Sequence, residues 1–171
     1  MNERISDWVE QMTEIQNGKP WIGSNFSNKM KLLSERNFFR RPMEHMHSVA
    51  EIISHLTTWR EETLVKLQKG TGSLKDDDPS NWKDPATLKA IGQSKIMEEY
   101  DQSLSGILSF LEGKSDDFLQ KSYFDGDFKG EYTYAWLLQG MLHHDIYHLG
   151  QIGYIIKFLN IGEQELSGNS S

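Results

Sequence analysis

Residues 140–159 of this 171-residue chain read GMLHHDIYHLGQIGYIIKFL, and histidines interrupt an otherwise apolar helical pattern there. His144 and His148 lie four positions apart, so on an α-helix they share one face, with Cβ atoms about 5–6 Å apart. The same stripe continues through the apolar residues Leu137, Met141, Ile152 and Ile155. Buried imidazoles need polar partners. A metal ion bound to both histidines would supply one, and ordinary hydrogen bonds within a core are the plainer alternative.

His55 is the best candidate for a third metal ligand. It lies on a second helical segment, beside the stripe of Ile52, Leu56 and Trp59. Metal sites in helical bundles are commonly built from side chains on facing helices. Three histidines with an open position are typical of a catalytic metal site rather than a closed structural one. Spacing alone still leaves His55 open as a core or boundary residue.

The pair does not form the metalloprotease motif H-E-x-x-H, in which a glutamate acts as general base. Asp145 occupies that position in HDIYH, and its side chain is one methylene shorter. The spacing therefore indicates a metal-binding helix but argues against a zincin mechanism.

Four long segments with helical periodicity predict an all-α fold, a four-helix bundle with one short extra helix and long loops. The segments cover about residues 2–17, 48–70, 84–113 and 132–159. Ser48 and Glu51 match the capping box at the start of the second segment, and Asp84–Pro85 predicts the start of the third. The short helix is expected near residues 25–35, a loop over 70–84, and an irregular hairpin within 114–131. We expect one domain over residues 1–160 and a flexible tail over 161–171.

Composition narrows the classes of function. The chain carries 18 basic and 25 acidic residues, a net charge of −7, which argues against a nucleic-acid partner and gives no attraction to an anionic membrane. It has no cysteine, so disulfides, thiolate-bound zinc and a cysteine nucleophile are excluded. No apolar stretch is long enough to span a membrane, and the N-terminus has no signal-peptide pattern. A cytoplasmic protein is the expectation.

Two motifs together resemble the DinB-like superfamily, which includes the YfiT-like metal-dependent hydrolases. They are SVAEIISHLTTWR at residues 48–60 and GMLHHDIYHLGQIGYIIK at residues 140–157. The resemblance covers nearly the whole chain and implies a four-helix bundle with an unusual helix order. It also implies a divalent metal held by three histidines, one in an HL context and two in an H-x-x-x-H-x-G-Q context. By motif these are His55, His144 and His148.

The resemblance implies a small-molecule substrate, a homodimer, and one of two activities. One is hydrolysis, and the other is S-transfer from a low-molecular-weight thiol such as bacillithiol or mycothiol. The absence of cysteine is compatible with the second, because the cosubstrate brings the sulfur. Imidazole ligands suit Zn, Ni or Fe among other metals. A non-catalytic metal-binding or stress-response module is the competing interpretation.

The sequence identifies no catalytic acid or base, but four further residues are candidates for the surroundings of the metal. Glu51 lies one turn before His55, although its capping-box role explains it without chemistry. Trp59 could form a wall of the pocket or simple core. Tyr147 and Gln151 follow the histidine pair closely enough to contact a ligand or substrate.

Two features remain open from the sequence. Trp21 and Trp82 lie in predicted loops and could be pocket or packing residues. Gly140, Gly150 and Gly153 each disfavour a helix by about 1 kcal/mol relative to alanine. Their presence in one helix suggests close helix packing around the histidines.

Overall fold

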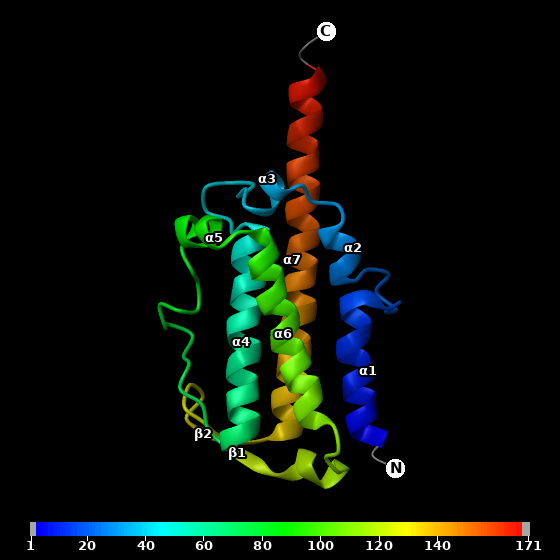
Figure 1. The fold of residues 1–171 in the computed structure, drawn as a ribbon, viewed down its shortest axis with the longest axis vertical. Helices are drawn as coiled ribbons and strands as arrows, with labels where there is room; N and C mark the ends of the chain where they lie inside the picture. Colours follow the sequence, from blue (N-terminus) through cyan, green and yellow to red (C-terminus); the bar gives the residue numbers. More distant parts are fainter. Residues whose placement is uncertain (1–2, 169–171) are drawn as a thin grey trace.

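The computed structural model describes residues 3–168, and four long helices form its bundle (Figure 1). They are α1 (Glu3–Asn17), α4 (Val49–Lys69), α6 (Gln93–Leu111) and α7 (Tyr134–Gly168). Helix α4 packs against both α6 and α7, and α1 completes the bundle through contacts with α6 and α7. The predicted four-helix bundle is therefore confirmed. Among the described helices, none combines the length and apolar content that crossing a bilayer requires.

Short elements connect the long helices. The predicted helix near residues 25–35 is divided into two, α2 (Phe26–Met30) and α3 (Glu35–Phe38). A 3₁₀ helix, η1 (Asp116–Gln120), precedes an antiparallel hairpin of β1 (Ser122–Asp125) and β2 (Gly130–Thr133), in which Tyr123 pairs with Tyr132. The hairpin lies where the last helix starts (Figure 1). An irregular hairpin was expected in this region, and the structure contains one.

Two helix boundaries differ from the sequence prediction. The single helix expected over 84–113 is broken into α5 (Pro85–Ile91) and α6, because Gly92 adopts a φ of +86° that no α-helix contains. Helix α7 continues to Gly168, past the expected end near residue 159. The division into a domain and a flexible tail at residues 161–171 stays a prediction, and residues 169–171 lie outside the described part.

The expected close packing at the α7 glycines is wrong. A Cβ atom added at Gly140 or Gly150 would have no neighbouring atom within 4 Å. At Gly153 it would meet only the Lys29 side chain, at 3.5 Å from Nζ and 3.6 Å from Cε. These glycines face open space or a flexible side chain, so no helix backbone approaches them.

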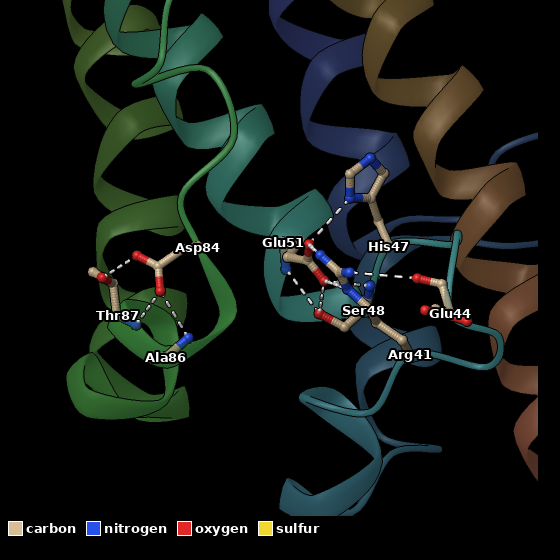
Figure 2. A network of polar contacts seen from close by, with 8 residues as sticks. All are labelled: Arg41, Glu44, His47, Ser48, Glu51, Asp84, Ala86 and Thr87. Atoms are coloured by element: carbon tan, nitrogen blue, oxygen red, sulfur yellow. Dashed lines mark hydrogen bonds and ion pairs between the residues drawn. The ribbon is translucent and has the colours of Figure 1, made fainter.

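A dense set of polar contacts fixes the start of α4 (Figure 2). The Ser48 hydroxyl accepts a hydrogen bond from the Glu51 backbone N–H, and the Glu51 carboxylate accepts one from the Ser48 N–H at 2.9 Å. The predicted capping box is thus confirmed. Arg41 and His47 also contact the carboxylate. Burial opposes its ionisation, but these hydrogen bonds lower the pKa of Glu51 to about 2.

A buried ion pair joins α4 to α7. The Arg60 guanidinium donates to Asp145 Oδ2 at 2.6 Å, and it also donates to the Tyr100 hydroxyl of α6 at 3.0 Å. Both charged side chains are almost fully excluded from solvent. Removing one partner of such a pair leaves an uncompensated buried charge, so the contact favours the helix register in which Arg60 and Asp145 meet. Because Asp145 follows His144 directly and Arg60 lies five residues after His55, this register also sets how the histidines face each other.

Candidate metal centre

The structure brings His55, His144 and His148 together between α4 and α7. The Nε2 atom of His144 lies 3.0 Å from Nε2 of His55 and 3.0 Å from Nε2 of His148. One ligand atom from each of the three lies within 4.8 Å of the others. This is the set of residues that the motif resemblance selected, and it is the cluster with metal-binding potential found among the described residues.

Two of the rings are oriented by hydrogen bonds on their other nitrogen. His55 Nδ1 lies 3.2 Å from the backbone oxygen of Asn81, and His148 Nδ1 lies 2.7 Å from Oε1 of Gln151. A carbonyl oxygen can only accept, so each Nδ1 carries the proton and each Nε2 presents a lone pair. Both lone pairs point at His144 Nε2, which can donate to one of them at most. Hydrogen bonding within the cluster can therefore satisfy at most one of the two nitrogen–nitrogen contacts.

The nitrogen spacing fits a metal ion. Two nitrogens bound to tetrahedral zinc at about 2.0–2.1 Å lie about 3.3 Å apart, close to the 3.0 Å observed here for two of the pairs. A cation among the three nitrogens would satisfy every lone pair at once. The donor set and its orientation could therefore hold a divalent metal ion.

The same imidazoles resist protonation. The pKa of His144 is lowered to about 3, chiefly by burial. The neighbouring imidazoles of His148 and His55 and the Arg60 guanidinium lower it further. Burial chiefly lowers the pKa of His148 to about 4, and it lowers the pKa of His55 as well. All three rings are neutral at pH 7, which is the protonation state that a metal ligand requires.

The loop over residues 70–84 supplies a wall that the sequence did not reveal. The indole of Trp82 lies parallel to the His55 ring, with centroids 4.0 Å apart and planes 6° apart, and it stacks on His47 at 3.8 Å on its other face. Asn81 next to it accepts from His55 through its backbone oxygen and from Trp59 Nε1 through its side chain. The sequence signal was the loop tryptophan itself, which could not be assigned to a pocket without the fold.

A pocket of about 730 Å³ opens beside the three imidazoles. Aromatic and apolar side chains of α4, α7, the 70–84 loop and the hairpin form most of its wall, including Trp59, Trp82, Trp136, Phe128, Leu137 and Met141. A concave, largely apolar cavity with a few convergent polar groups is the usual form of a small-molecule site. The cluster therefore faces a space that can hold an organic ligand.

The four surrounding candidates have different positions. Trp59 lines the pocket and meets the His55 and His144 rings edge-on, with centroids 6.4 and 6.3 Å away. Tyr147 lines the mouth and is mostly exposed, and Gln151 contacts His148. Glu51 is absent from the pocket wall, because its carboxylate is engaged in the helix cap.

Of the remaining aromatic and histidine residues, some line the pocket and others lie outside it. Trp21 is 99% exposed and lies away from the pocket, whereas His47 lines it. His143 is exposed, on a different face from His144, as its position in the sequence predicts.

Fold and site together define a class: a four-helix bundle with three histidines from two helices beside a largely apolar pocket. The sequence profile of the DinB superfamily matches residues 23–152, and the chain belongs to that superfamily. No curated protein matches the chain.

Two solved structures from Bacillus subtilis share the fold. YfiT, described as "a probable metal-dependent hydrolase with an unusual four-helix bundle topology", aligns with a TM-score of 0.62 at 13% identity over 94% of this chain and 90% of its own. The DinB-like protein YjoA aligns with a TM-score of 0.61 at 14% identity over 92% of each chain. At these identities the similarity establishes the fold, and the function of this chain must come from its own site.

Proposed function

We propose that this protein is a divalent-metal-dependent hydrolase whose metal ligands are His55, His144 and His148. One observation carries the proposal: the lone pairs of His55 Nε2 and His148 Nε2 both face His144 Nε2 at 3.0 Å. His144 Nε2 can donate to only one of these lone pairs, so the other nitrogen–nitrogen contact is repulsive unless a cation lies among the three rings. Three protein ligands leave an open coordination position, as in catalytic zinc sites.

The residues around the cluster would orient the ligands and exclude water. Asn81 and Gln151 hold the rings of His55 and His148 so that Nε2 faces the metal, and Trp59 and Trp82 cover the cluster on the α4 side. A bound divalent cation would supply Lewis acidity and lower the pKa of water to about 7. Zn, Ni and Fe all accept imidazole ligands. The aromatic wall would hold the organic part of the substrate against the open position.

A low-molecular-weight-thiol S-transferase is the second candidate, and one observation favours it. In the described part of the chain, no carboxylate forms a hydrogen bond with any of the three imidazoles. Glu51 and Asp145 are engaged in the helix cap and in the ion pair with Arg60. A thiol needs less help from a general base than water does, because its pKa is about 8.5.

Metal binding by purified protein tests the proposal. We expect one equivalent of divalent metal in the wild type after reconstitution, loss of that metal in His144→Ala, and retention in the control His143→Ala. The control removes an exposed imidazole one residue away. Unfolding monitored by circular dichroism would show that both variants keep the fold. Failure of the wild type to bind any divalent metal would refute the proposal.

An activity panel then separates the two candidates. Metal-dependent cleavage of simple esters or amides supports the hydrolase. Metal-dependent conjugation of an electrophile by bacillithiol or mycothiol supports the transferase. If metal binds but neither reaction is observed, the non-catalytic module is the better interpretation.

A further inference from the structure

A second polar centre lies in the same pocket, away from the histidines. Lys66 of α4 lines the pocket and is only 4% exposed to solvent. Its ammonium donates to Asp125 Oδ2 of the hairpin at 2.8 Å. A buried lysine beside a ligand cavity is unusual, because charged side chains are seldom buried without a structural or functional partner.

The Asp125 carboxylate is fully engaged, whereas the Lys66 ammonium is not. Asp125 Oδ2 also accepts from the Tyr123 hydroxyl at 3.0 Å, and Oδ1 accepts from two backbone N–H groups of the turn, at residues 127 and 128. An ammonium has three N–H donors. Within the described residues, the bond to Asp125 is the one hydrogen bond that Lys66 makes, and the Trp59 and Tyr123 rings lie 5.8 and 5.9 Å from its nitrogen, so two of its N–H groups have no oxygen or nitrogen acceptor there.

Trp59 relates the position of this ammonium to the metal centre. The ammonium lies 5.8 Å from the centre of the Trp59 ring, and the centre of the His144 ring lies 6.3 Å from the same point. The ammonium is therefore no more than about 12 Å from the His144 imidazole. A single small molecule can reach both ends of a cavity of this size.

We propose that Lys66 binds a carboxylate group of the substrate while another part of the same molecule meets the metal. Asp125 and Tyr123 act as positioning residues that hold the ammonium in place. The substrate class is then a small amphipathic carboxylate whose apolar body packs against the wall formed by Phe128, Trp136 and Met141. This inference rests on the proposed function, since it assigns substrate recognition to the pocket of the metal centre.

Two other carboxylates line the pocket and would favour the opposite charge. Asp76 is exposed and Asp127 is half-buried, so water screens both more strongly than it screens Lys66. A cationic substrate is the alternative that these residues predict. Probes that share one skeleton and differ in charge can therefore decide between the two recognition modes.

Calorimetric titration of zinc-reconstituted protein with 3-phenylpropionate, 3-phenylpropanol and 3-phenylpropylamine is the test. We expect the carboxylate to bind most tightly and the amine most weakly. Lys66→Met should weaken the binding of 3-phenylpropionate by about tenfold or more, which is the scale of one charge-assisted hydrogen bond. It should leave the affinity for 3-phenylpropanol within about twofold of the wild-type value. Lys69→Met is the matched control, because Lys69 is exposed in the same last turn of α4 and does not line the pocket.

Lys66→Met leaves Asp125 without its cation, so the double variant Lys66→Met/Asp125→Asn provides a neutral replacement if the single variant unfolds. The double variant should show the same selective loss of the carboxylate. Tighter binding of the amine, or unchanged 3-phenylpropionate affinity in both Lys66 variants, would overturn the proposal. So would loss of carboxylate binding in His144→Ala alone, since the probe would then bind the metal. Zinc stoichiometry is read separately, which distinguishes failure of this inference from failure of the metal site.

Discussion

The hydrogen bond between His148 and Gln151 allows a direct test of how the proposed metal site is organised. In Gln151→Leu, His148 Nδ1 loses the acceptor that now lies 2.7 Å away. The ring is then free to rotate or to move its proton to Nε2, where it blocks metal binding. Loss of such an oriented contact typically weakens metal affinity about 10- to 100-fold, which corresponds to about 1.4–2.8 kcal/mol.

A competitive zinc titration against a chromophoric chelator would measure the effect. Gln151→Glu keeps an acceptor and makes the imidazole more basic, so its zinc affinity should equal or exceed that of the wild type. Gln139→Leu is the control, because Gln139 is an exposed glutamine on the same helix that does not line the pocket. Equal zinc affinities for Gln151→Leu and Gln139→Leu would refute the reasoning.

Three further predictions concern stability and pH. Glu51→Gln should lower the free energy of unfolding by about 2–3 kcal/mol in chemical denaturation, because it weakens charge-assisted hydrogen bonds at the α4 cap. Zinc affinity should stay unchanged in this variant. A weaker zinc affinity would place Glu51 in the site. Zinc affinity should fall only slightly from pH 7.5 to 5.5, because the imidazoles of His144 and His148, with pKa values of about 3 and about 4, stay neutral there and burial lowers the pKa of His55 as well. With two imidazoles of unperturbed pKa, zinc affinity would fall about 100-fold over the same interval. A fall of that size would show that the rings are solvated. Gly150→Ala should raise the free energy of unfolding by up to about 1 kcal/mol, since nothing lies near its Cβ, and a destabilised variant in thermal melts would contradict the open surface seen at this position.

The ion pair of Arg60 and Asp145 lies next to the histidines but does not line the pocket. Asp145 stands in the HDIYH motif, where a protease would carry its general base, yet it points to Arg60 and away from the pocket. Burial raises the pKa of this carboxyl while the guanidinium opposes that rise. The Arg60 charge in turn contributes to lowering the pKa of His144. One buried contact therefore joins the two helices that carry the histidines and helps to keep His144 neutral.

The sequence alone determined the elements whose signals are local. Helical periodicity, the capping box of Ser48 and Glu51, and the proline that follows Asp84 depend on residues within one or two turns, and the structure contains each of them. The spacing of His144 and His148 also placed both on one helix face, the helical pattern of the second segment made His55 the best third candidate, and the motif resemblance supported that choice.

Local signals were insufficient where the conformation of one residue or a distant contact decides the outcome. Gly92 could have continued a helix, and only its positive φ divides α5 from α6. The α7 glycines suggested close packing from sequence, but whether another helix lies beside them is a tertiary fact.

Only the tertiary structure decided what surrounds the three histidines. Trp82 stacks on His55 from 27 residues away, and Lys66 meets Asp125 across 59 residues. No periodicity connects residues so distant, because the loop and the hairpin are placed by packing on the bundle rather than by their own sequence. The sequence thus located the three histidines, while the fold made them converge, kept them neutral and built the pocket that they face.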